Sequence, residues 1–397
     1  MSLQSAFTLN ANEIFSTVAN MIISQQVFAD NLGKHQTLVD KARVDGSLYG
    51  DKKLYYSTDV LKSHPWGGDS EASNLLSLDR PSDPKVQAIT LNVFRQIRLT
   101  VDQYLSKRFW IEEGSFSSFN SIMLGWMRET KRVYDGTLYN CFIGANQTST
   151  GKQVVQVDLG TGSGHPLYNL TGVEKEQMEA MLIAQALADL FVDMGDYLRS
   201  YNDNQFLRSY EDESIKVIRN SKFVNKIRKI SLPTIFHKDG LVDKFEEDIL
   251  PARYFGVKIT ATNASSYSAE TPTTGKPIDS DTDVYTPGVG NANGTIRSMV
   301  EKDITVSATD YHVFPGDEIP AGSTIKASGT FEYGEVYIEQ ADIICKVLVK
   351  LPPFMSAFEV GTSFFNQRSL TENHYLTWAH NTLEYLENYP FITVKKI

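Results

Sequence analysis

Residues 115–146 read SFSSFNSIMLGWMRETKRVYDGTLYNCFIGAN, the longest helical pattern in the chain. Apolar residues recur there every three or four positions, with some drift, as on one face of a helix. That face consists of Phe116, Phe119, Met123, Trp126, Val133, Leu138 and Cys141. At about 1.5 Å for each residue, roughly 30 residues make a rod of about 45 Å, which is long for a globular helix. Gly125 and Gly136 weaken the helix and would allow a bend. We expect this helix to be the spine of the fold.

A small module of mixed α and β structure is predicted downstream of the spine helix. Residues 154–166, VVQVDLGTGSGHP, supply a strand and a glycine turn, and residues 171–198 supply a second helix. Thr171 as N-cap and Glu174 three residues later predict a capping box. The module continues with a strand, a short helix opened by Ser221 and a further strand: SIKVIRN (214–220), SKFVNKIRKI (221–230) and YFGVKIT (254–260).

Upstream of the spine helix, the pattern predicts an arm followed by an extended loop. Residues 1–40 contain an amphipathic helix candidate. Between residues 41 and 112, two alternating runs, KKLYYSTDV (52–60) and VQAITLNVFRQIRLTV (86–101), predict strands on either side of a polar loop of about twenty residues. This loop carries the apolar residues Trp66, Leu75, Leu76 and Leu78. Apolar residues on a projecting loop usually anchor in a partner, although these four could also fold back on their own domain.

The last third of the chain is predicted to be rich in strands. Residues 261–335 are dominated by Thr, Ser, Gly, Pro and Asp, with runs such as DITVSATDYHVF and STIKASGTF, which predict an all-β insertion with long loops. VYIEQADIICKVLVKL (336–351) and YPFITVKKI (389–397) predict closing strands. Residues 374–386, HYLTWAHNTLEYL, fit a strand and a helix equally well.

Composition and charge restrict the class of protein. The chain has 397 residues, of which 41% are hydrophobic, and this is enough for two or three domains with real cores. Its net charge of -10 argues against a surface that mainly neutralises phosphates. Cys141 and Cys345 are too few for a disulfide framework or a zinc site, so we expect buried thiols. We also expect a soluble protein, because no signal-peptide pattern is visible and no run reaches the roughly 18 apolar residues of a membrane span.

An enzymatic alternative starts from DLGTGSG (158–164), which resembles the first motif of S-adenosylmethionine-dependent methyltransferases. That fold needs a helix directly after the glycine turn and then a second strand that ends in an acid. Here HPLYNLTG follows the turn, and the acids at the right distance fall inside the predicted helix. A second segment, Leu351-Pro352-Pro353-Phe354, resembles the Asn/Asp-Pro-Pro-aromatic motif of amino-group methyltransferases. It has leucine in place of the residue that would bind the amine.

Other candidate chemistry is sparse. His374 and His380 are six residues apart, a spacing that does not place them on one helix face, so we expect packing or surface histidines. We expect the basic run to be the solvated side of a short helix or to meet acidic neighbours in an assembly, although it could also contact phosphate. This run contains Lys216, Arg219, Lys222, Lys226, Arg228 and Lys229. The sequence therefore predicts no enzyme, no cofactor and no metal site.

The order of these elements resembles the major capsid protein of tailed bacteriophages, the Hong Kong 97-type capsid fold. The resemblance covers most of the chain and rests on arrangement more than on sharp motifs. It implies an α+β fold with these parts: an N-terminal arm (1–40), an extended loop (41–112), a peripheral domain with the spine helix (113–170), an axial domain (171–260), the β-rich insertion (261–335) and a return through both domains (336–397). SIKVIRNSKFVNKI (214–227) is similar to the strand-then-helix segment of the axial domain.

The resemblance also implies a function. Members of this family assemble as hexamers and pentamers into an icosahedral shell around double-stranded DNA, with a portal and often scaffolding or head-decoration proteins. It places the protein in the virion capsid, and in the host cytoplasm during assembly, without a membrane partner. An encapsulating compartment of the same fold is the second alternative beside the methyltransferase. Under the capsid interpretation, the loop residues Trp66, Leu75, Leu76 and Leu78 are the predicted subunit interface.

Overall fold

A computed structural model describes most of the chain between Thr37 and Ile397. The described residues are 37–45, 52–63, 80–102, 113–146, 153–228, 246–264, 284–285, 294–326 and 329–397. The chain divides into two compact units, each built from segments that are far apart in sequence. The first unit takes Met1–Lys53, Ile89–Gly136 and Pro353–Leu383, and the second takes Leu54–Ala88, Thr137–Pro352 and Glu384–Ile397.

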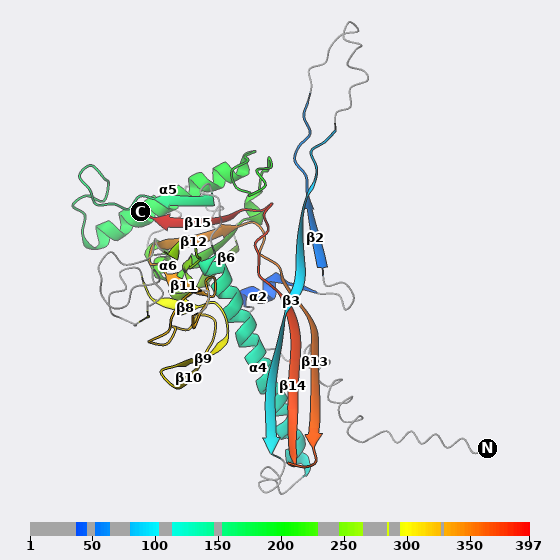
Figure 1. Cartoon of the computed structure of the whole chain (residues 1–397). Coiled ribbons are helices and arrows are strands. Elements are labelled where there is room, and N and C mark those ends of the chain that lie inside the picture. The colour runs from blue at the N-terminus through cyan, green and yellow to red at the C-terminus, as the bar shows by residue number, and fades with distance from the viewer. Residues whose placement is uncertain are drawn as a thin grey trace, which may run out of the picture. The chain divides into compact units, whose positions relative to one another are not determined.

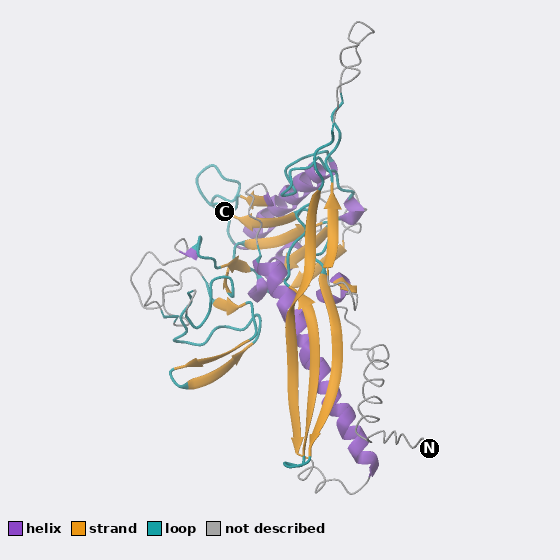
Figure 2. Ribbon diagram, turned by 45° about the vertical axis from the view of Figure 1, so that its right-hand side comes forward, coloured by secondary structure: helices purple, strands orange, loops and turns teal. Residues whose placement is uncertain are grey.

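The first unit is organised by long strands that lie side by side (Figures 1 and 2). They belong to a five-stranded sheet with the order β1-β13-β14-β3-β2. These strands are β1 (Arg43–Asp45), β2 (Lys52–Ser57), β3 (Lys85–Asp102), β13 (Phe354–Asn366) and β14 (Thr371–Asn381). The two predicted strands of the extended loop are therefore confirmed as β2 and β3, and the undecided segment from residue 374 is a strand, β14, up to Asn381.

Burial alternates along β3 because successive side chains of a strand point to opposite faces. Thr90, Asn92, Phe94 and every second residue up to Thr100 are exposed, whereas the residues between them are buried or half-buried. The covered face packs on the helix α4 (Glu113–Ala145) of the same unit, where Tyr134 meets the ring of Trp378 edge-on at 5.9 Å. One face of this sheet is therefore covered by α4.

The predicted spine helix is confirmed as α4, but its predicted apolar face is partly wrong. Trp126 and Val133 are exposed on the subunit, with 62% of Trp126 accessible. The buried face instead contains two charged residues, Lys131 and Asp135, together with Tyr134. The spacing of apolar residues misassigned the face because these charges have partners far away in sequence: Lys131 pairs with Glu359, and Asp135 with Arg43.

The second unit is built around another five-stranded sheet, with the order β4-β15-β12-β5-β6. The predicted strands at 154–157 and 214–220 and the predicted helices from 171 and from 221 are confirmed here, whereas the strand predicted in YFGVKIT (254–260) belongs to a separate three-stranded sheet. Its strands are β4 (Val154–Val157), β5 (Lys216–Asn220), β6 (Glu246–Leu250), β12 (Ile343–Leu348) and β15 (Phe391–Lys396), and its helices are α5 (Gly172–Gly195), α6 (Ser221–Arg228) and the short η3 (Asp212–Ser214) and η4 (Ala252–Tyr254). Buried residues of α5, such as Ile183 and Leu187, share one hydrophobic cluster with Val217 of β5 and Val394 of β15.

The C-terminal end of α4 covers the opposite side of this sheet. Phe142 packs against Phe391 with ring centroids 6.3 Å apart. Lys346, fully buried on β12, donates hydrogen bonds to the carbonyl of Asn146 and to the hydroxyl of Thr393, both 2.8 Å long. A cation near the last carbonyls of a helix is favourable, which offsets part of the cost of burying this ammonium group. Burial still lowers the pKa of Lys346 to about 7.

The β-rich segment of the second unit has a hydrophobic cluster of its own. Its core draws on residues between Ile259 and Ile338, including Phe331 and Val306. The strands are β7 (Gly256–Lys258), β8 (Ile296–Ser298) and β11 (Val336–Glu339), which form a sheet with the order β7-β11-β8, and β9 (Lys302–Val306) with β10 (Thr309–Val313), which form a hairpin. The β content predicted for this stretch is confirmed in its described residues, although STIKASGTF contributes only isolated bridges.

The start of α5 corrects one prediction. Thr171 occupies the N-cap position with extended backbone angles, but its side chain makes no capping hydrogen bond. The next residue, Gly172, has φ +60°. This left-handed conformation replaces the ordinary first helical residue, so the predicted capping box with Glu174 does not form. A short helix, α2 (Leu38–Ala42), begins at a reciprocal pair that the sequence reasoning missed, Thr37 and Asp40.

Both cysteine thiols should be unreactive in the native protein. Cys141 and Cys345 are free and buried, as predicted, and burial raises the pKa of each thiol to about 12. Because the thiolate is the reactive species, a disulfide reagent at pH 8 should label neither residue in native protein and both in guanidinium. Absorbance of the released aryl thiolate measures this, and rapid labelling of one thiol per native chain would contradict it.

Candidate functional site

The loop between β2 and β3 was the predicted partner site. Trp66, Leu75, Leu76 and Leu78 lie outside the described residues. The described residues on both sides of them continue the apolar character, because five large apolar side chains there are exposed: Leu54, Tyr56, Val60, Leu61 and Val86. Tyr56 is 67% accessible and Leu61 is 75% accessible. Exposed apolar groups gathered on one surface are characteristic of a contact with another protein.

An ionic anchor fixes the base of this loop. Arg199 donates to one carboxylate oxygen of Asp59 at 2.6 Å, and the amide of Leu207 donates to the other at 3.0 Å. Arg208 donates to the carbonyl of Thr58. The hydrogen bond from Arg199, followed by that from Leu207, lowers the pKa of Asp59 to about 2. The carboxylate therefore stays ionised over the physiological range and holds the loop base to residues 199–208.

We expect a measurable but modest coupling energy between Asp59 and Arg199. In a double-mutant cycle of Asp59→Ala and Arg199→Ala, urea unfolding should give a coupling energy of about 0.5–1 kcal/mol, since the pair is partly exposed. Asp83→Ala, which removes an exposed carboxylate elsewhere in the loop base, should not couple to Arg199→Ala. Equal coupling in both cycles would show that the effect is general electrostatics and not this contact.

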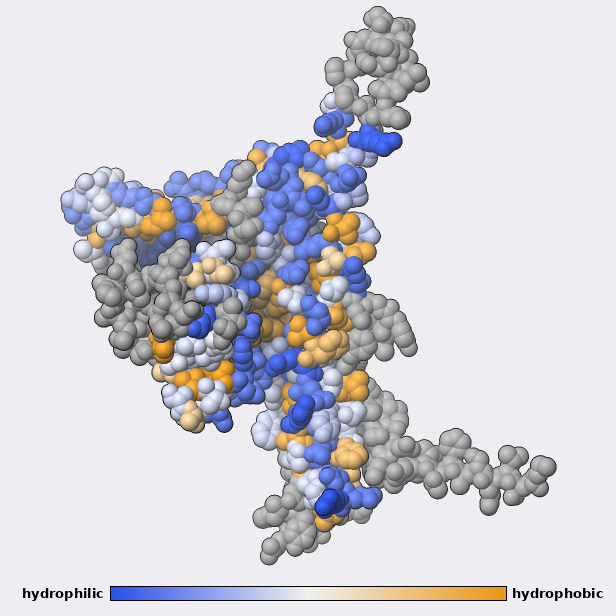
Figure 3. Space-filling view, viewed as in Figure 1, coloured by the Kyte–Doolittle hydropathy of each residue, from blue (hydrophilic) through white to orange (hydrophobic). Residues whose placement is uncertain are grey.

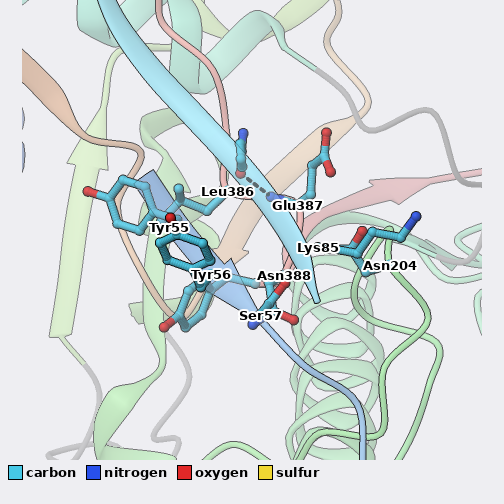
Figure 4. Close-up of a pocket in the computed structure, with 10 residues that line it drawn as sticks. Tyr55, Tyr56, Ser57, Lys85, Asn204, Leu386, Glu387 and Asn388 are labelled. Carbon is cyan, nitrogen blue, oxygen red and sulfur yellow. Dashed lines mark hydrogen bonds between the residues drawn. The ribbon is translucent and has the colours of Figure 1, made fainter. Parts of the chain in front are cut away.

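A small pocket lies along β2 (Figure 4). Tyr55, Tyr56 and Ser57 of β2 line one side, and Lys85, Asn204 and the segment 386–389 complete it. The side chain of Gln87 donates to the carbonyl of Tyr385 at 2.9 Å and accepts from the amide of Glu387 at 3.1 Å, so it joins β3 to this segment. Tyrosines among polar side chains suit a protein contact better than catalysis.

A second exposed surface lies on the first unit. On the uncovered face of the long strands, Phe94 is 67% and Phe364 is 63% accessible, and Val360 is also exposed. Polar cross-strand pairs separate them, since Gln96 bonds Thr377 at 3.0 Å and Thr100 bonds Asn373 at 2.6 Å. Figure 3 shows apolar and polar side chains interspersed over these strands. Such a mixture is typical of non-obligate interfaces.

The glycine turn DLGTGSG serves a structural purpose. It follows β4, which lies at the edge of its sheet next to β15 in the part of the chain that the structure describes. The Asp158 carboxylate accepts a hydrogen bond from the amide of Gly160 at 2.8 Å, and Gly164 has φ +98°, which favours glycine. A nucleotide-binding strand is flanked by parallel strands and leads directly into a helix. Among the described strands, β4 has a parallel neighbour, β15, on one side alone, and turns separate it from α5, so DLGTGSG does not have the surroundings of a nucleotide-binding turn.

The other candidate groups also have structural partners. The carbonyl of Pro352 accepts a hydrogen bond from the buried hydroxyl of Tyr139 at 2.8 Å, so the proline pair links two elements and is not an open site. His374 and His380 are both buried on the same face of β14, as packing histidines. In the basic run, Arg219 pairs with Glu247 of the neighbouring strand β6 in the same chain, and the expected contact with acidic groups in an assembly stays a prediction.

Within the described parts of the chain, no three His, Cys, Asp or Glu side chains gather as metal ligands. Among the helices in those parts, none is long and apolar enough to cross a membrane.

Comparisons with known proteins identify the fold. No protein-family model and no curated protein matches the sequence. A chain in the capsid structure of Staphylococcus phage Andhra is 10% identical, with a TM-score of 0.52 over 91% of this chain and 84% of that one. A chain in the structure of the head fibre and inner core protein gp22 of bacteriophage P68 is 11% identical, with a TM-score of 0.52 over 92% and 87%. This chain has the phage capsid fold. The expected α+β class is confirmed with it, whereas the division into named domains stays a prediction.

The surfaces differ in how far the sequence could reveal them. The loop residues Trp66, Leu75, Leu76 and Leu78 were predicted from their polar setting in the sequence, whereas the exposed apolar residues on the loop flanks were not predicted. Phe94, Val360 and Phe364 were missed because, in sequence, they look like ordinary alternating strand residues. The available signal was the period of two itself, which places Phe94 on the face opposite to that of buried Leu91 and half-buried Val93.

Proposed function

We propose that this chain is the major capsid protein of a tailed double-stranded DNA bacteriophage. The observation that carries the proposal is a fold match to a phage capsid structure over nine-tenths of the chain. Hexamers and pentamers of the subunit would form an icosahedral shell, in the virion and, before that, in the host cytoplasm. The role is structural and not enzymatic, and no cofactor or membrane is involved.

The exposed surfaces supply a mechanism for assembly. Apolar groups on the loop flanks and on the open face of the long strands would each bury a modest area on neighbouring copies. In a closed shell such contacts repeat around symmetry axes, so many weak interfaces give a stable container. The interface predicted at Trp66, Leu75, Leu76 and Leu78 belongs to this proposal.

The remaining partners follow from the same role. A portal and, where used, scaffolding or head-decoration proteins would contact the shell. The net charge of -10 suits a container whose contact with packaged DNA is loose and non-specific, because strong phosphate binding requires excess basic residues.

Particle formation tests the proposal. Purified protein should sediment as capsomers or shells, and negative-stain microscopy should show hollow particles or rings. A monodisperse monomer at every concentration, together with saturable S-adenosylmethionine binding, would defeat it. Neighbouring genes for a portal and a terminase, as opposed to a cargo enzyme, separate the phage shell from an encapsulating compartment.

A further inference from the structure

The first unit contains a buried carboxylate that is only partly neutralised. Asp135 of α4 is 0% exposed. Its Oδ2 atom accepts a hydrogen bond from Arg43 at 3.2 Å, whereas its Oδ1 atom has no hydrogen-bond partner. An ionised carboxylate in such a place is costly unless all its oxygens are satisfied. The site therefore favours a neutral acid more strongly than a surface position does.

The charged and titratable groups at and near this site come from five elements. Arg43 of β1 and Lys131 of α4 attract its charge, while Glu359 of β13 repels it and is paired with Lys131. On β14, His380 is buried near Lys131 and near Arg95 of β3, and burial is the main cause that lowers its pKa. Burial is also the largest effect on Asp135 and raises its pKa to about 6 in spite of the two cations.

Arg43 has a second partner on its own segment. Its Nε atom lies 3.1 Å from Oδ1 of Asp40, and Asp40 accepts hydrogen bonds from the amide and the hydroxyl of Thr37. Burial acts to raise the pKa of Asp40, but the bonds from Thr37 and the charge of Arg43 outweigh it and lower the pKa below 3.8. Of the two carboxylates on Arg43, Asp135 is thus protonated first as the pH falls.

We propose that Arg43 and Asp135 form an acid-releasable latch that fastens residues 37–45 to the helix α4. Protonation of Asp135 removes the ionic link, and Arg43 stays paired with Asp40, so the segment keeps its internal contacts. Buried Leu38 and Val39 and the three-residue pairing of β1 with β13 remain. Acid therefore loosens the segment without detaching it.

The latch opens without destabilising the unit. The folded-state pKa of Asp135 lies above its unfolded value of about 3.9, so the native state binds the proton first. This group therefore makes the fold more stable as the pH falls from about 6 to about 4, because the cost of the buried charge disappears. The same proton weakens the link to Arg43, so loosening is local.

Hydrogen exchange of the full-length protein tests the latch. The measurement reports on contacts within one chain, so its outcome does not depend on whether shells form. After correction for intrinsic rates, peptides covering residues 37–45 should exchange on the order of tenfold faster at pH 5.0 than at pH 7.5. Peptides from β14 should not change. Equal protection of residues 37–45 at both pH values would overturn the proposal.

Two variants test whether the Arg43–Asp135 pair causes the pH dependence of exchange. Asp135→Asn should exchange quickly in residues 37–45 at pH 7.5 and lose the pH response, whereas Asp83→Asn, an exposed carboxylate, should behave as wild type. Arg43→Gln provides the test if Asp135→Asn fails to fold, and it should be fast at both pH values. A pH response that survives in either latch variant would assign it to another group, such as His380, and would also overturn the proposal.

Discussion

Replacing Gly144 by alanine should lower the free energy of unfolding by about 3 kcal/mol or more. A Cβ atom at this position would lie 2.1 Å from the carbonyl oxygen of Tyr254 and 2.6 Å from its carbonyl carbon. Both are backbone atoms, so no side chain can turn away to relieve the clash. Either α4 or the segment 252–255 would have to move, although Phe255 and Cys141 beside them are fully buried.

Gly136→Ala is the matched control, because it makes the same chemical change in the same helix. Nothing lies within 4 Å of a Cβ atom at that position. The variant should be more stable than wild type by about 0.5–1 kcal/mol, since alanine favours the helix. Urea unfolding of both variants at equal assembly state measures the contrast. Similar stability of the two would mean that α4 and residue 254 are not in close contact.

The helix α4 illustrates what a local pattern can and cannot predict. Its existence followed from apolar spacing over about 30 residues, which few other structures satisfy. The identity of its buried face did not, because Lys131 and Asp135 are buried through pairs with Glu359 and Arg43. Their partners are more than 90 residues away in sequence, so no window along the chain contains the reason for burial.

The long hairpin of β13 and β14 could not be predicted from the sequence, for a different reason. Its turn has no Asn-Gly or Asp-Gly signal, and Leu370 takes the left-handed position there, with φ 54°. The six-residue spacing of His374 and His380 excluded one helix face but is an even number, which places both on one face of a strand. The spacing was therefore informative only once the strand was known.

Replacing Trp66, Leu75, Leu76 and Leu78 together by serine should abolish shell assembly while leaving the subunit folded. If each apolar side chain is buried on a neighbour, its loss removes about 1.5 kcal/mol or more from the contact. That loss recurs in every subunit, so a closed shell should not form even at high concentration. Sedimentation velocity measures assembly, and circular dichroism measures the fold.

The matched control changes the same loop without touching its apolar groups. Ser70, Ser73 and Ser77 replaced together by alanine should assemble like wild type. If the apolar variant also forms normal shells, the loop tip is not an interface, and the capsid proposal would then rest on the other exposed surfaces.

Variants in the loop flanks distinguish a contact made by the loop tip alone from an interface along the whole loop. Tyr56→Ser and Leu61→Ser remove exposed side chains without disturbing the Asp59 anchor, which holds the base through its own hydrogen bonds. If the interface continues from the tip to the base, each variant should raise the protein concentration needed for assembly, and neither should abolish it. No change in either variant would confine the contact to the tip.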